Sequence, residues 1–321
     1  MENSSIVMKE RLGFFEIIKE SLKIPFKNPY FILFTFLTSL PLFCFLVLCE
    51  IILQHILIET GKILQETPDP FRKILGDDYS RVLDIGHLLE EVSPEVLLLG
   101  FLYLGILHCL DLFNTIATVD VASIIYAGEK SITLKDMFFI PVKESRFKGP
   151  LITSICSLSL AFLILIGLLS FATYIYITSA DVLFMLLFVV IFIALLGKYM
   201  EWSAIWNMGI VISVLEEKQG DVALLISSYL SRCNRPCGFF LMLVFFIWRF
   251  ALRFSCLYVG WNNGGSSLVI TVVHISLVSL LNLLKWMSIL VYFYDCKKQS
   301  AYQHTDVEEA KSRNDLQGAP L

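Results

Sequence analysis

The longest uncharged stretch of this chain constrains its fold more than any other feature. Residues 149–180 form a run of 32 positions without Asp, Glu, Lys or Arg. A helix needs roughly 20 apolar residues to cross a hydrocarbon core about 30 Å thick. Hydrophobic residues make up 56% of the 321 positions and charged residues only 17%, so most of the chain has this character. The sequence predicts an all-α, polytopic membrane protein and excludes a nucleic-acid binder.

Six apolar segments are long enough to cross a bilayer. We place the spans at about 30–52, 96–126, 150–178, 182–214, 238–259 and 268–294, within a membrane domain of residues 30–295. Residues 1–29 form an N-terminal segment with an interfacial helix, and an acidic loop at 59–95 joins the first two spans. The polar segment 296–321 lacks apolar periodicity and is expected to be a disordered tail.

The positions of Lys and Arg predict the orientation, because cationic connections stay in the cytosol. One side of the membrane holds 17 of these residues, in the N-terminal segment, two connections and the tail, whereas the opposite side holds four. Both termini are therefore expected in the cytosol and the loop at 59–95 outside it. The expected location is the endoplasmic reticulum, another endomembrane or the plasma membrane. The expected partners are the lipid bilayer and its anionic headgroups at the cytosolic face, and the sequence identifies no protein partner.

A threefold repeat organises the six spans. An amphipathic stretch precedes each odd-numbered span, near residues 12–22, 131–140 and 221–229. At a spacing of 88, residues 123–130 align with 211–218, and at a spacing of 87, residues 198–200 align with 285–287. The common period predicts three units, each composed of an interfacial helix and two spans.

Three motifs carry a resemblance to a known family. They are Gly13-Phe14-Phe15-Glu16 with Pro29, the passage from Asn114-Thr115-Ile116-Ala117 to Lys130, and Val211-Ile212-Ser213-Val214-Leu215-Glu216-Glu217. In these motifs the chain resembles a plant family of uncharacterised six-span membrane proteins, over nearly its whole length except the tail. The resemblance implies a six-span architecture and a plant endomembrane setting, and it supplies no catalytic residues.

Charged side chains inside the spans are the main functional candidates. Each costs about 2.5 to 3.5 kcal/mol to insert, so such groups normally pair or line a polar cavity. Asp111, Lys198 and Lys285 share one depth, roughly 22 to 26 Å from the outer ends of their spans at 1.5 Å per residue. The full candidate cluster is Asp111, Asn114, Lys198, Glu201, Arg249, Arg253 and Lys285.

Two interpretations of this cluster stay open. In the first, the helices converge and the charges bind an anionic solute, a proton or a lipid headgroup. In the second, the charges are structural: Lys198 pairs with Glu201, and the two arginines pair with Asp111 or extend to lipid phosphates. A water-accessible cavity lined by Asp111, Lys198 and Lys285 favours the first interpretation, and mutually paired or lipid-facing charges favour the second.

The remaining motifs do not favour catalysis. Cys233, Cys237 and Cys296 lie at the predicted cytosolic boundary, where S-acylation occurs, although unmodified thiols are the default interpretation. The chain contains no P-loop, G-x-S-x-G or H-E-x-x-H motif, and no cofactor or metal site is predicted. We expect a non-enzymatic protein of membrane organisation or trafficking. The alternative is a transporter or channel for a small solute, an ion or a lipid, using the charged layer.

Overall fold

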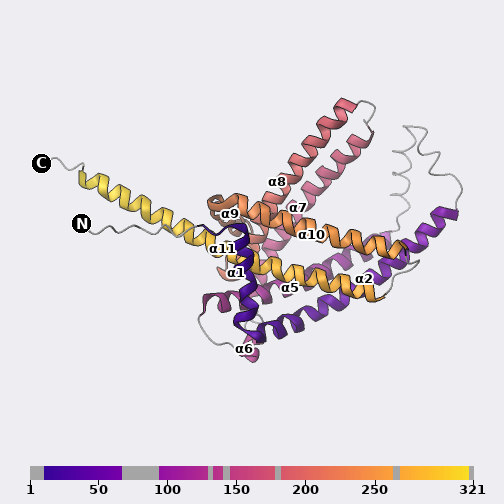
Figure 1. The fold of residues 1–321 in the computed structure, drawn as a ribbon, viewed down its shortest axis with the longest axis horizontal. Helices are drawn as coiled ribbons and strands as arrows, with labels where there is room; N and C mark the ends of the chain where they lie inside the picture. The colour runs from indigo at the N-terminus through magenta and orange to yellow at the C-terminus, as the bar shows by residue number, and fades with distance from the viewer. Residues whose placement is uncertain are drawn as a thin grey trace.

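The computed structural model describes residues 11–66, 94–128, 133–139, 145–177, 182–262 and 268–317. Every regular element in this part of the chain is a helix (Figure 1). The helices are α1 (Phe14–Lys27), α2 (Pro29–Glu66), α5 (Pro94–Ala127), α6 (Leu134–Phe139), α7 (Ser145–Ile177), α8 (Val182–Leu215), α9 (Gly220–Ser231), the short 3-10 helix η1 (Arg232–Asn234), α10 (Arg235–Asn262) and α11 (Leu268–Gln317).

Six helices of the described chain are long and apolar enough to cross a membrane, in α2, α5, α7, α8, α10 and α11. Their outer surfaces are apolar, as lipid contact requires. Leu163 on α7 and Leu186 on α8, for example, are 65% and 67% exposed. Large apolar patches of this extent are rare on soluble monomers. The prediction of an all-α protein with six transmembrane helices is confirmed.

The helix order reproduces the three repeated units. Each unit has a short helix followed by two long ones: α1, α2 and α5, then α6, α7 and α8, then α9, α10 and α11. Figure 1 shows α1, α6 and α9 at the same end of the long helices. Each short helix packs against spans of another unit, α1 on α11, α6 on α2, and α9 on α7 and α8. The short helices therefore hold the three units together.

The first interfacial helix is fixed at both its start and its inner face. The Gly13 backbone N–H donates to Glu16 Oε2 at 2.9 Å, which caps the first turn of α1. Ile17 and Ile24 are fully buried, and Ser21 Oγ lies 3.0 Å from Ser288 Oγ of α11. The motif that carries the family resemblance at residues 13–16 thus has a local structural role.

The helix α9 lies unusually close to α8. A Cβ atom added at Gly209 would lie 2.8 Å from Leu224 Cδ2, so only a glycine permits this contact without a shift. Ser227 Oγ donates to the Ile205 carbonyl of α8 at 2.6 Å. Gly209 therefore lets the Leu224 side chain of α9 pack directly against α8.

A polar cap starts α6, which lies outside the spans. Thr133 Oγ1 donates to Asp136 Oδ2 at 2.6 Å, and the Thr133 backbone N–H donates to the same oxygen at 3.3 Å. These hydrogen bonds lower the pKa of Asp136. The cap begins the helix at Leu134 and leaves Met137 fully buried.

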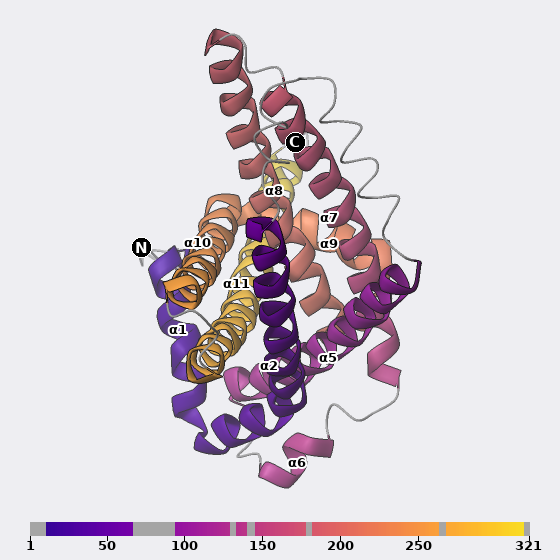
Figure 2. The same ribbon diagram turned by 90° about the vertical axis from the view of Figure 1, so that its right-hand side faces the viewer.

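The α7–α8 hairpin diverges from the other long helices. Figures 1 and 2 show this hairpin extending away from the bundle formed by α2, α5, α10 and α11. The hairpin joins the bundle at the end that carries the short helices, where α8 packs against α10 and α11. Met208 of α8, Leu241 of α10 and Leu290 of α11 are fully buried there. The main core therefore lies at the end of the molecule that carries the short helices.

The last helix is longer than the sequence predicts. The segment 296–321 is expected to be a disordered tail, whereas α11 continues from the sixth span to Gln317. No Gly or Pro interrupts residues 298–317, and residues 318–320 then supply Gly-Ala-Pro. Good helix formers continue a helix that has already started, because only its nucleus is costly. The acidic loop at 59–95 lies largely outside the described residues, although α2 is helical to Glu66.

Candidate functional site: a charged cavity within the membrane

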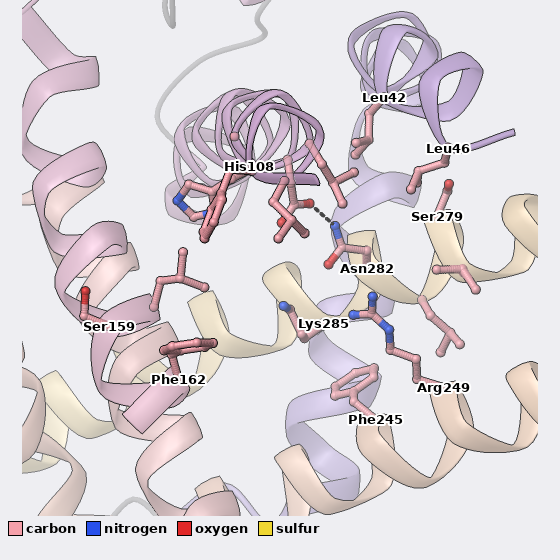
Figure 3. Close-up of a pocket in the computed structure, with 18 residues that line it drawn as sticks. Leu42, Leu46, His108, Ser159, Phe162, Phe245, Arg249, Ser279, Asn282 and Lys285 are labelled. Atoms are coloured by element: carbon pink, nitrogen blue, oxygen red, sulfur yellow. Dashed lines mark hydrogen bonds between the residues drawn. The ribbon is translucent and has the colours of Figure 1, made fainter. Parts of the chain in front are cut away.

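A cavity of about 670 Å³ lies among α2, α5, α7, α10 and α11. Leu158, Ser159 and Phe162 of α7 line one side of the cavity (Figure 3). The facing bundle contributes the remaining lining residues, which include Leu42 of α2 and Phe245 of α10. The cavity is therefore placed between the diverging α7–α8 hairpin and the bundle of four helices.

Polar side chains from three helices meet at one end of this cavity. Asn282 Nδ2 of α11 donates to Asp111 Oδ1 of α5 at 2.9 Å, which orients the carboxylate. Lys285 Nζ lies 4.2 Å from the ring centroid of its neighbour Trp286, in a cation–π contact. Arg249 of α10 also lines the cavity, and Figure 3 shows the ends of Lys285, Arg249 and Asn282 directed toward this common region.

The charges at this end do not cancel. Among the described residues, neither Arg249 nor Lys285 forms an ion pair with a carboxylate, and Asp111 is the one carboxylate among the lining residues. With Arg249 and Lys285 charged and Asp111 ionised, the cavity carries an excess of one positive charge. An uncompensated cation inside a membrane is costly, so this arrangement favours an anion.

A hydrogen bond ties the hairpin to the bundle beside the cavity. His108 Nε2 of α5 lies 2.6 Å from Ser154 Oγ of α7, and His108 also lines the cavity. His108 and Asp111 are three residues apart on α5 but contact different helices, since the His108 ring nitrogen contacts α7 and the Asp111 carboxylate contacts α11.

Arg253 belongs to a separate ion pair. Its Nη1 donates to Glu50 Oε1 of α2 at 2.6 Å, and the Glu50 side chain is only 10% exposed. The expected alternative, a pair between Arg253 and Asp111, is not observed. The pair joins α10 to α2 one helical turn beyond Arg249, so it stabilises the wall of the cavity without neutralising Arg249.

Lys198 and Glu201 lie outside the cavity. Lys198 Nζ donates to Glu201 Oε2 at 2.7 Å on the same helix, as the structural interpretation expects. Arg235 Nη1 lies 3.5 Å from the other Glu201 oxygen. The common depth of Lys198, Asp111 and Lys285 therefore does not bring them to one site, since Lys198 is on the exposed side of α8.

Most of the remaining candidates lie in the protein interior. Asn114 is buried, and its Oδ1 has no hydrogen-bond partner in the described structure. Cys237 and Cys296 are buried, whereas Cys233 is partly exposed. Burial makes Cys237 and Cys296 poor acceptors for an acyl group in this conformation, which leaves Cys233 as the accessible candidate. The described residues contain no group of three or more His, Cys, Asp or Glu side chains suited to a metal ion.

Two partners were missed by the sequence reasoning. Glu50 directly follows the charge-free run of the first span, and its position inside the span 30–52 is the signal that identifies it as an intramembrane charge. Asn282 carries no charge, so a search for ionisable groups does not find it. An uncharged amide three residues before Lys285, on the same helix face, is the signal that would have included it.

Comparison with known proteins supplies a family and no assigned activity. Residues 1–319 match the family described as a domain of unknown function, DUF8558. No curated protein and no solved structure matches the chain.

Proposed function

The chain belongs to the DUF8558 family, and from that premise we propose a function based on its cavity: the protein binds an anionic ligand within the membrane. A single observation carries this proposal. Arg249 and Lys285, from two helices, line the same intramembrane cavity without an ion pair to any described carboxylate. The other spanning cations with described ion pairs, Lys198 and Arg253, each have a carboxylate within 2.7 Å.

Two cations in the cavity, unpaired among the described residues, make the empty site costly. A charged side chain in the centre of a span costs about 2.5 to 3.5 kcal/mol when nothing compensates it. An anion held between Arg249 and Lys285 lowers this cost for both cations through charge-assisted hydrogen bonds. Asp111, held by Asn282, limits the excess charge to one and adds an acceptor for a polar group of the ligand. Binding is thus favoured for a ligand that carries negative charge.

We place this activity in membrane transport or lipid handling rather than in catalysis. The cavity combines a charged end with apolar walls, which suits a solute or lipid that moves between bilayer and protein. The cation distribution supports cytosolic termini, and the resemblance supports a plant endomembrane setting. Transport of the ligand, as distinct from binding alone, requires that the α7–α8 hairpin close over it.

The test uses the purified full-length protein in an uncharged detergent. Thermal unfolding is measured with chloride, phosphate, oleate and phosphatidylglycerol, for wild type, the double variant Arg249→Gln/Lys285→Gln, and Lys198→Gln. The proposal expects at least one anion to raise the melting temperature of wild type and of Lys198→Gln, but not of the double variant. Lys198 is the matched control because it lies in a span but outside the cavity. Stabilisation by no anion, or equal stabilisation of the double variant, contradicts the proposal.

A second function, membrane organisation, is favoured by the short helices. On α1, Phe15 and Phe26 are 82% and 83% exposed, and on α9, Leu225 is 74% exposed. Lys23 and Lys27 lie on α1 near these apolar side chains, as in helices that lie in an anionic membrane surface. Replacing Phe15 and Phe26 by Ser should weaken any vesicle reshaping by the reconstituted protein, seen by electron microscopy. Unchanged reshaping would exclude a role for this face of α1.

A further inference from the structure

The geometry of the cavity points to a ligand class: we infer that it binds a single-chain amphiphile with one negative charge, such as a long-chain carboxylate, entering sideways from the bilayer. The inference rests on the proposed anion site and specifies its ligand. Four features of the cavity carry it, namely its charge, its length, its size and its opening.

The charge of the cavity matches a monoanion. Arg249 and Lys285 contribute two positive charges and Asp111 one negative charge, and no other lining residue is an acid or carries a fixed charge. One carboxylate neutralises the excess. A phosphate monoester carries about −1.5 to −2 at pH 7, which would leave unpaired negative charge inside the membrane.

The length of the cavity matches one acyl chain. On α5 the lining runs from Asp111 at the charged end to Phe101, ten residues away. Ten residues span roughly 15 Å along a helix axis. This is half of a hydrocarbon core about 30 Å thick, the depth that the chains of one leaflet occupy. Leu104 of α5 and Leu46 of α2 line the intervening part, so the tail meets an apolar wall.

The size of the cavity fits one acyl chain better than a complete phospholipid. A volume of about 670 Å³ is in the range of pockets for ligands of drug size, roughly 300 to 1,000 Å³. A phospholipid with two chains and a glycerol headgroup needs more space than one chain and a carboxylate. The volume therefore favours a ligand with a single tail.

The opening of the cavity faces the bilayer. Phe101 is 72% exposed, Leu104 57% and Phe162 60%, although all three line the cavity. These residues lie in membrane spans on α5 and α7, so the side on which they are accessible is surrounded by lipid. Figure 3 shows Phe162 and Lys285 on the two sides of the open space. An amphiphile can thus enter between α5 and α7 with its tail still in the hydrocarbon.

A glycine in the wall provides a specific variant. Gly105 lines the cavity between Phe101 and Asp111, and a Cβ atom added there meets no heavy atom within 4 Å. Gly105→Leu therefore places a bulky side chain in the path of the tail, at a position where the added Cβ atom has no close neighbour. Gly197 of α8 is equally open but does not line the cavity, so Gly197→Leu is the matched control.

The experiment measures equilibrium binding of radiolabelled oleate to the full-length protein in uncharged detergent. Oleyl alcohol tests the charge, butyrate tests the tail, and phosphatidylglycerol tests the number of chains, each as an unlabelled competitor. We expect unlabelled oleate to displace the radiolabelled oleate. Oleyl alcohol, butyrate and phosphatidylglycerol should each compete with an affinity at least about tenfold lower, a difference of about 1.4 kcal/mol in binding free energy. Gly105→Leu should weaken oleate binding about tenfold, and Gly197→Leu should leave it unchanged.

The outcomes separate this inference from the proposed function. Equal competition by butyrate or phosphatidylglycerol, or wild-type binding of oleate by Gly105→Leu, overturns the ligand class but leaves an anion site dependent on Arg249 and Lys285. Equal competition by oleyl alcohol, or oleate binding that survives Arg249→Gln/Lys285→Gln, overturns both. If no anion of the wider panel binds wild type, the proposed function itself fails. The melting temperatures of the ligand-free variants show that each of them is folded.

Discussion

Replacing Glu50 by Gln isolates a positive charge inside the membrane. Arg253 Nη1 lies 2.6 Å from Glu50 Oε1, and the two side chains are 36% and 10% exposed. Removing one partner of a buried ion pair costs about 3 to 5 kcal/mol, and an Arg at the centre of a span costs about 2.5 to 3.5 kcal/mol. Because Arg253 is the more exposed partner, it can extend toward headgroups, so we expect the lower value, about 3 kcal/mol.

The assay is reversible unfolding in bicelles by steric trapping, applied to wild type, Glu50→Gln, Arg253→Gln and the double variant. The double variant should be more stable than Glu50→Gln, because it leaves no unpaired charge in the span. Glu20→Gln is the control, since it breaks an exposed pair with Lys23 on α1, worth about 0.2 to 0.5 kcal/mol. A loss in Glu50→Gln no larger than in this control, or a double variant as unstable as the single one, refutes the reasoning.

Three further predictions concern packing, modification and topology. Gly209→Val should destabilise the protein by about 1 to 3 kcal/mol through overpacking against Leu224, whereas Gly197→Val should be well tolerated; thermal unfolding compares them, and equal losses would contradict the close contact. If the protein is acylated in cells, Cys233→Ser should remove the label captured by an acyl-exchange assay, and label retained on buried Cys237 would disprove this assignment. Protease added outside sealed endomembrane vesicles should spare residues 59–95, and cleavage there would reverse the topology.

The six spans were predictable because each depends on local composition. The apolar run at 182–214, for example, corresponds to α8 from Val182 to Leu215. A single hydrophobic segment that crosses a bilayer forms a helix, because only a helix satisfies all its backbone hydrogen bonds within the segment. The threefold repeat was predictable for the same reason, as it requires only comparison of the sequence with itself. The continuation of α11 to Gln317 differs from the expected disordered tail, because a polar segment of high helix propensity can extend a helix without being hydrophobic.

The site was only partly predictable. Counting residues from a span end predicts the depth of a side chain, and on this basis the sequence predicts a layer of intramembrane charge formed by Asp111, Lys198 and Lys285. The depth of a residue in the membrane does not determine which other helix its side chain contacts. That contact depends on how the helices pack together. Lys198 thus lies on the exposed side of α8, while Asp111 and Lys285 line the cavity with Arg249.

The partners of these charges needed the three-dimensional structure. Glu50 and Arg253 are 203 positions apart, and Asp111 and Asn282 are 171 apart, so no local pattern links them. The divergence of the α7–α8 hairpin, which opens the cavity, has no signal in composition, because α7 and α8 are as apolar as the other spans.

The most direct measurement is native mass spectrometry of the full-length protein, extracted from its own membrane in an uncharged detergent. Wild type and Lys198→Gln should each retain one adduct that is released on unfolding and detected as a singly charged anion. Arg249→Gln/Lys285→Gln should lack that adduct while remaining folded. An adduct of the same mass and occupancy in all three proteins, or a wild type that carries no anion, would contradict an anion site between Arg249 and Lys285.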